Sequence, residues 1–151
     1  MANNPYGAYQ KQQEQQEDIR LSEARALLRM AALMEEMQKP GASYLDYSDA
    51  VRQNQQLWTL FQAAMMEEDN KLPHALKQTL KGLSIYVDRR SLKAIGNHEP
   101  RLLSVLININ KEIAAGLMES VKNDVSAAGA VLNAPPQSPS PQSGGSISGQ
   151  F

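Results

Sequence analysis

Cysteine is absent from this chain of 151 residues, and histidine occurs only twice. Without cysteine the protein has no disulfide, no thiolate metal site and no cysteine nucleophile. His74 and His98 fall in different predicted connections and lack a second histidine or an acidic residue at ligand spacing, so we expect no metal site. The sequence also lacks a catalytic constellation of side chains. We therefore expect neither an enzyme nor a cofactor-binding protein.

A glycine-rich phosphate loop is missing too, because Gly82, Gly96 and Gly116 stand alone in the sequence. Gly116 falls within the most apolar segment of the chain. We expect it to allow close helix packing at the edge of an apolar stripe. The alternative is an ordinary helical glycine, which costs about 1 kcal/mol relative to alanine.

Neither sign of charge dominates, since the chain has 15 Lys and Arg residues, 16 Asp and Glu residues and a net charge of −1. Nucleic-acid-binding domains are usually basic on one face, so direct RNA binding is not expected. The small basic group at Asp88–Arg90 and Lys93 falls at a predicted helix end, where it complements the helix dipole. No apolar run approaches the roughly 18 residues that span a bilayer. With no secretory signal pattern at the start, we expect a cytoplasmic protein without membrane contact.

The composition changes near residue 126, beyond which Pro, Ser and Gly dominate and no charged residue occurs. Such a segment buries too little apolar surface to offset the entropy of ordering it. We predict a disordered tail at 125–151 and a helical domain at 15–124. Residues 1–14 are predicted as a polar N-terminal segment or a frayed extension of the first helix.

Helix-breaking residues gather at Lys39–Gly41, Asn70–Pro73 and Gly96–Pro100. Ser43 is a suitable N-cap for the helix after the first break, and Pro73 suits a first helical position. Short connections favour antiparallel neighbours. The fold class is therefore all-α, a small antiparallel helical bundle with a disordered C-terminal tail. Its helices, about four in number, are predicted near 15–39, 44–68, 73–94 and 99–123.

Two asparagines interrupt the most apolar run. Strand-like alternation covers only Leu106–Asn110, whereas helical spacing of apolar residues extends over Leu102–Val121, so we predict a helix. On that helix Asn108 points outward and Asn110 lies within the apolar stripe. Asn54 occupies a similar position on the second helix. The two buried amides are expected to share a polar contact, either with each other or with an interhelical loop. They would fix helix register or bind a partner's backbone.

The first predicted helix is apolar on two sides, which is typical of a helix that is central in a bundle or binds a partner. Methionine is common on adaptable binding surfaces. We therefore take Met30, Met34 and Met37 as partner-binding candidates, with ordinary core as the alternative. One face consists of Ile19, Ala26, Leu27, Met30, Leu33, Met34 and Met37. The other face consists of Leu21, Ala24, Leu28 and Ala32.

Three short motifs resemble the FlaF family of flagellar biosynthesis proteins over about residues 6–120. An N-x-x-L-W segment, an N-x-L-P break and a closing I-N-x-x-I-A-x-G-L segment occur here in order. The tail after Val125 has no counterpart in that pattern, and the stretch 10–18 is richer in glutamine than the family leads us to expect. The residues that match the motifs are Asn54, Leu57, Trp58, Asn70, Leu72, Pro73, Asn110, Gly116 and Leu117.

The resemblance implies a cytoplasmic chaperone that binds flagellin and promotes its synthesis and export. We hypothesise that the bundle covers a terminal amphipathic helix of flagellin in an apolar groove, with Met30, Met34 and Met37 as one wall. The alternative is a regulator of flagellin translation that acts with an FlbT-like protein or on flagellin mRNA. A third possibility is a generic adaptor without a flagellar role.

Overall fold

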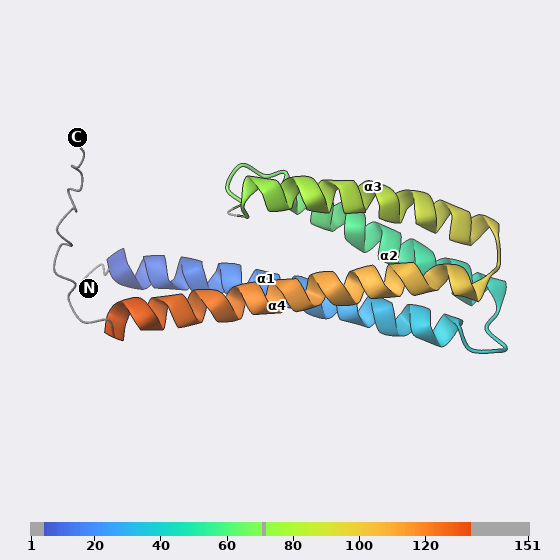
Figure 1. Ribbon diagram of the computed structural model, residues 1–151, viewed down its shortest axis with the longest axis horizontal. Coiled ribbons are helices and arrows are strands. Elements are labelled where there is room, and N and C mark those ends of the chain that lie inside the picture. Colours follow the sequence, from blue (N-terminus) through green and yellow to red (C-terminus); the bar gives the residue numbers. More distant parts are fainter. Residues whose placement is uncertain (1–4, 71, 134–151) are drawn as a thin grey trace, which may run out of the picture. The chain divides into compact units, whose positions relative to one another are not determined.

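The computed structural model describes residues 5–70 and 72–133 (Figure 1). All regular structure in these residues is helical, which confirms the all-α class. The chain divides into two units, Met1–Val121 and Lys122–Phe151. Within the first unit each helix runs antiparallel to the next along the chain, so the predicted bundle is also confirmed. The elements are α1 (Pro5–Met37), α2 (Tyr44–Met65), α3 (His74–Gly96), the 3-10 turn η1 (Pro100–Leu102) and α4 (Leu103–Asn133).

The start of α1 and the end of α4 differ from the prediction. Helix α1 begins at Pro5 rather than near residue 15. Proline is favoured in the first helical turn, and the Gln, Glu and Lys residues that follow are good helix formers. Helix α4 continues to Asn133, so the predicted disordered tail is wrong for residues 125–133. This stretch is rich in alanine, and a pair of prolines that disfavours helix comes only at 135–136. Residues 134–151 lie outside the described part of the chain.

The turn between α1 and α2 depends on a glycine and a serine. Gly41 has a positive φ of 93°, a conformation that side chains with a Cβ rarely adopt. Two residues later, the Ser43 hydroxyl accepts a hydrogen bond from the Asp46 backbone N–H at 3.1 Å. This bond confirms Ser43 as the N-cap of α2.

Asn70 organises the connection between α2 and α3. Its side-chain amide donates to the Ala64 carbonyl at 3.2 Å, and its side-chain oxygen accepts from the Leu72 N–H at 3.0 Å. The Lys77 ammonium donates to the Asn70 carbonyl at 2.7 Å. Pro73 is the N-cap of α3 and not its first helical residue as predicted, so the helix begins one residue later, at His74. The N-x-L-P motif therefore encodes an Asx-type turn that ends α2 and starts α3.

The connection between α3 and α4 is held by the first turn of α2. The Tyr44 hydroxyl donates to the Ile95 carbonyl at 2.7 Å. The Tyr47 hydroxyl lies 3.1 Å from the Glu99 carbonyl and 3.3 Å from the Asn97 carbonyl, and can donate to either. These bonds tie segments about fifty positions apart and fix the end of the bundle opposite the Asn70 turn.

The apolar core runs along the middle of the bundle, and its largest member is Trp58, which meets Phe61 edge to face. Each fully buried Leu, Val or Phe contributes roughly 1.5–3 kcal/mol. The core contains Ala24, Leu27, Ala31, Met34, Tyr47, Val51, Trp58, Phe61, Met65, Leu80, Val87, Ala94, Leu102, Leu103, Leu106, Ile107, Ala114 and Leu117.

Candidate partner-binding site

A buried amide network joins α1, α2 and α4. The Asn110 side-chain amide donates to the Asn54 side-chain oxygen at 2.6 Å and to the Leu27 carbonyl at 3.1 Å. The Asn110 side-chain oxygen accepts from the Trp58 indole N–H at 2.8 Å. The predicted contact is therefore confirmed as a direct bond between the two asparagines. Both side chains are fully buried, and Asn108 is exposed as predicted. Their burial favours the expected role in helix register over contact with a partner's backbone.

The Asn54 side-chain nitrogen has no hydrogen-bond partner within the described residues. A buried unpaired donor costs roughly 1–3 kcal/mol. Rotating the Asn54 amide would not remove this cost, because it would place an Asn54 N–H group against the Asn110 N–H group. The Asn54–Asn110 bond thus carries a penalty that an apolar pair would not, and we keep helix register as the hypothesis for its role.

The other motif residues separate into core and surface positions. Leu117 is buried, and Leu72 packs against the core. Gly116 is exposed, and a Cβ built on it would meet no atom within 4 Å. The prediction that Gly116 allows close helix packing is therefore wrong, because a Cβ at this position would point into open space. It is an ordinary helical glycine on the outside of α4.

Replacing Gly116 by alanine is expected to stabilise the protein by about 0.5–1 kcal/mol. Alanine has a higher helix propensity, and the new methyl group meets no neighbour. Urea denaturation followed by circular dichroism measures the change. Gly41→Ala is the matched control, expected to cost about 1–2 kcal/mol because Gly41 has a positive φ. A loss of stability in Gly116→Ala would contradict the exposed position.

The three methionine candidates are buried to different extents. Met34 is 0% exposed, and Met37 packs against the core. Met30 is half-buried. The core-facing side of α1, which carries Ala24, Leu27, Ala31 and Met34, runs between the two apolar faces predicted from the sequence. In this arrangement a partner can touch Met30 and Met37 but not Met34, so the three do not form one exposed wall.

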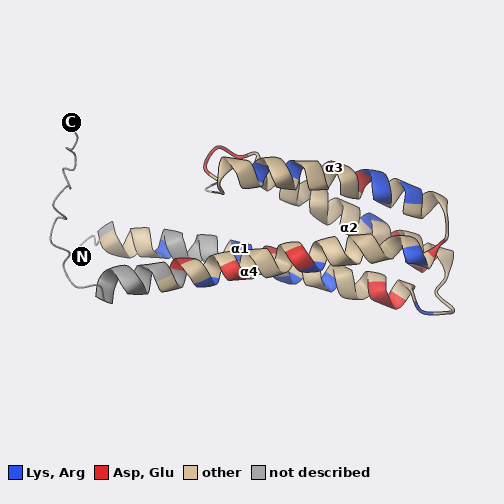
Figure 2. Cartoon of the chain, viewed as in Figure 1, with Lys and Arg blue, Asp and Glu red and all other residues tan. Residues whose placement is uncertain are grey.

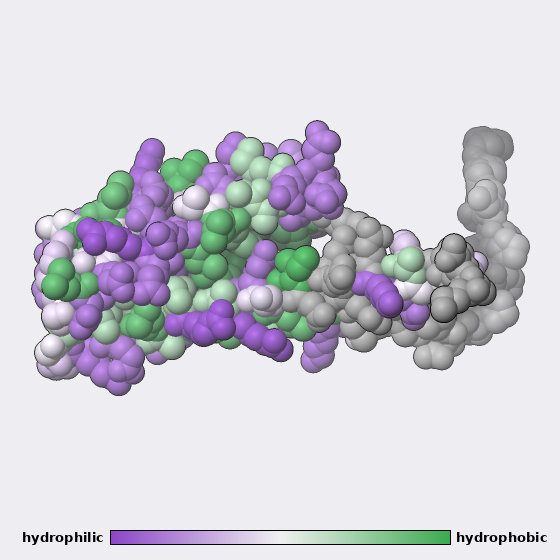
Figure 3. Space-filling view, turned by 180° about the vertical axis from the view of Figure 1, so that it is seen from behind, coloured by the Kyte–Doolittle hydropathy of each residue, from purple (hydrophilic) through white to green (hydrophobic). Residues whose placement is uncertain are grey.

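A small apolar cleft lies instead between α1 and α2. Its volume is about 90 Å³, and it is lined by Glu23, Leu27, Leu57, Leu60 and Phe61. Leu57 is half-buried and Leu60 is 69% exposed. Figure 3 shows hydrophobic side chains gathered in a hollow where α2 lies over α1. Sequence reasoning missed this cleft because Leu60 lies off the apolar stripe of α2, and an exposed leucine alone is not a signal.

Glu23 is the charged group of this cleft. It is half-buried, and it forms no ion pair with a described residue. Burial raises the pKa of the Glu23 carboxyl above its ordinary value. The direction follows from the loss of water around the charged form without a compensating cation.

Lowering the pH from 7 is expected to increase the stability of the wild-type protein relative to Glu23→Gln. The raised pKa means that the folded protein holds the Glu23 proton in a pH range where the unfolded chain, with a pKa of about 4.3, has lost it. Stability from this group therefore falls as the pH rises through that range.

The glutamine variant lacks this titration, so it should be the more stable protein at pH 7, and the difference should close toward pH 4. Urea denaturation of both proteins at a series of pH values tests the sign. A difference that does not change with pH would show that Glu23 is not desolvated.

A larger hollow of about 280 Å³ lies between α2 and α3, and its lining mixes polar side chains with Trp58, Ile85 and Val87. The Gln55 amide donates to the Asp88 carboxylate there, and the Ser84 hydroxyl donates to the Gln62 oxygen at 2.9 Å. These groups already satisfy one another. This hollow is therefore a weaker candidate than the apolar cleft.

Charged residues of both signs are spread over the described helices (Figure 2). Two cations of α3 hold loop carbonyls: Lys77 bonds Asn70, and Arg90 lies 3.3 Å from the Leu102 carbonyl. Among the side chains that the structure describes, no three or more potential metal ligands gather into one group. Among the helices of these residues, none has the length and apolar character to span a membrane.

Comparison with known families gives the decisive observation. The model of the family described as "Flagellar protein FlaF" matches residues 6–117. The chain belongs to the FlaF family. The family match covers nearly all of α1, all of α2 and α3, and α4 as far as Leu117, so it includes the amide network, the Asn70 turn and the cleft. No curated protein and no solved structure gives a significant match.

Proposed function

We propose that this FlaF-family protein is a cytoplasmic chaperone that binds flagellin and promotes its synthesis and export. It acts by binding and not as an enzyme. Family membership supports a flagellar role. The observation that carries the binding proposal is the accessible apolar cleft between α1 and α2.

The cleft suits an apolar anchor of an amphipathic helix. Its lining is apolar apart from Glu23, so water inside it makes few hydrogen bonds and is favourably displaced by an apolar side chain. The volume of about 90 Å³ corresponds to roughly three waters in the liquid. One side chain of the bound helix fills it.

A wider surface around the cleft supplies the remaining contact. Ile19 on α1 is 55% exposed, and Leu60 projects from α2. Met30 lies on the same side of α1 as Glu23, two turns further along the helix. The partner helix therefore rests on α1 and α2, with Met30 at the rim and Met34 supporting α1 from the core.

Mixing the purified protein with flagellin and measuring mass by size-exclusion chromatography with light scattering tests the proposal. Wild type is expected to form a complex, and Leu60→Glu is expected to lose it. Leu45→Glu is the matched control, because Leu45 is also on α2 and is 76% exposed, but it does not line the cleft. Both variants place the charge in water, so both should fold.

No complex with wild-type protein would overturn the chaperone proposal. Equal binding by Leu60→Glu and Leu45→Glu would keep the chaperone and move its site away from the cleft. A complex with an FlbT-like protein in the absence of flagellin binding would favour the translational regulator. The mixed surface charge predicts no strongly salt-dependent RNA binding.

A further inference from the structure

We infer that the α1–α2 cleft recognises a helix that carries a Lys or Arg next to its apolar anchor, and that this cation pairs with Glu23. The inference rests on the proposed function and specifies the chemistry of the bound segment. A purely apolar helix, an acidic helix and a second copy of this chain are the competing occupants.

The geometry places charge and apolar surface in one small site. Glu23 lines the same cleft as Leu27, Leu57, Leu60 and Phe61. An apolar side chain that enters the cleft therefore comes to rest beside a carboxylate. Groups attached to the same partner helix within one turn of that side chain then lie within reach of Glu23.

Among the described residues, no cation pairs with the Glu23 carboxylate. The described ion pairs use Glu35, Glu36 and Glu99, and Glu23 has none. Docking an apolar helix over Glu23 would remove more water from an unpaired charge, which opposes binding. A Lys or Arg on that helix reverses this effect, because a charge-assisted hydrogen bond replaces the lost water.

The spacing on the partner follows from helix geometry. Side chains three or four positions apart lie on the same helix face. The bound segment should therefore have a Leu, Ile, Met or Phe with a Lys or Arg three or four positions away. A segment with an acidic residue in that position is disfavoured by like-charge repulsion with Glu23. This repulsion makes the cleft specific for amphipathic helices that carry a cation.

The test measures the affinity for full-length flagellin by fluorescence titration at low and high salt. Glu23→Gln keeps the shape of the side chain and removes its charge. We expect about tenfold weaker binding at low salt and a smaller salt dependence, since screening acts on the lost pair. Glu23→Lys should bind still more weakly.

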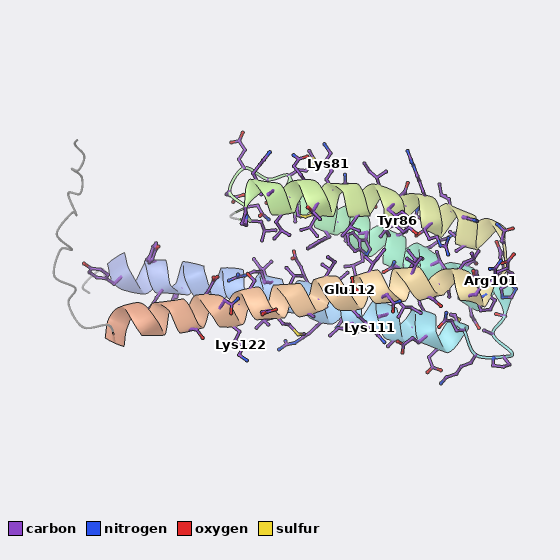
Figure 4. All side chains as sticks on the ribbon, viewed as in Figure 1. Lys81, Tyr86, Arg101, Lys111, Glu112 and Lys122 are labelled. Carbon is purple, nitrogen blue, oxygen red and sulfur yellow. The ribbon has the colours of Figure 1, made fainter. Side chains whose placement is uncertain are left out.

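Glu112→Gln is the matched control for net charge. Glu112 is exposed on α4 (Figure 4), whereas the cleft is formed by α1 and α2. Its affinity should stay within about twofold of wild type, as is usual for exposed charges away from a contact. A Lys→Glu or Arg→Glu substitution at the matching position of flagellin should weaken wild-type binding and be rescued by Glu23→Lys.

The outcomes separate the two proposals. No binding by wild type overturns the chaperone itself. Binding that is lost in Leu60→Glu but unchanged or tighter in Glu23→Gln keeps the cleft and overturns the cation, because the occupant is then apolar or acidic. A dimer of this chain that dissociates in Glu23→Lys would assign the cleft to a second copy and overturn the inference.

Discussion

Replacing Asn110 by alanine is expected to lower the free energy of unfolding by about 3–5 kcal/mol. The substitution removes three hydrogen bonds and leaves the Trp58 N–H and the Asn54 side chain buried without partners. Each buried unpaired polar group costs roughly 1–3 kcal/mol, and the cavity adds to this. Urea denaturation at neutral pH measures the loss.

Asn54→Ala is the companion variant and should cost less. Its loss leaves the Trp58–Asn110 and Asn110–Leu27 bonds in place and removes the unpaired Asn54 nitrogen. The double variant should cost less than the sum of the single variants, because the two residues share one bond. Equal costs and strict additivity would show that the two amides act independently.

Replacing Met34 by serine is expected to cost about 3–5 kcal/mol, because the side chain is fully buried. Shortening a buried methionine leaves a cavity, and the new hydroxyl needs a partner that the apolar surroundings do not supply. The protein should unfold at clearly lower urea concentration or fail to accumulate. Thermal denaturation followed by circular dichroism gives an independent measurement.

Met30→Ser separates packing from binding, because Met30 is only half-buried. Its expected cost is below about 1.5 kcal/mol, since less apolar surface is lost. A combined serine substitution of Met30, Met34 and Met37 would lose flagellin binding through unfolding, so only Met30→Ser reports on the surface. A stable Met34→Ser protein would place Met34 outside the core.

The core residues of the bundle could be predicted from the sequence where helical spacing of apolar residues extends over many positions. Asn54 and Asn110 each interrupt an apolar helical stripe, and a polar residue in such a place needs a partner inside the bundle. The choice between a shared bond and separate loop contacts required the structure, because helix spacing does not fix the rotation of one helix against another. The same limit applied to α1, whose core side falls between the two predicted faces.

The surface could not be predicted in the same way. Gly116 was expected in a helix contact, but its exposure depends on which side of α4 faces α1 and α2. The cleft combines Glu23 of α1 with Leu60 of α2, and no pattern within either helix marks such a pair. The end of α4 was placed too early because the change in composition near residue 126 preceded the proline pair at 135–136.

The Leu27–Asn110 bond also sets an order of events during synthesis. These residues are 83 positions apart, so at about 5–20 residues per second the ribosome needs roughly 4–17 s to make the stretch between them. Gln62 and Ser84, which join α2 to α3, are 22 positions apart and can meet after roughly 1–4 s. The α2–α3 contact can therefore form before α4 has been made. During that interval the part of α1 that meets α4 in the folded protein, where the Leu27 carbonyl bonds Asn110, has only α2 beside it.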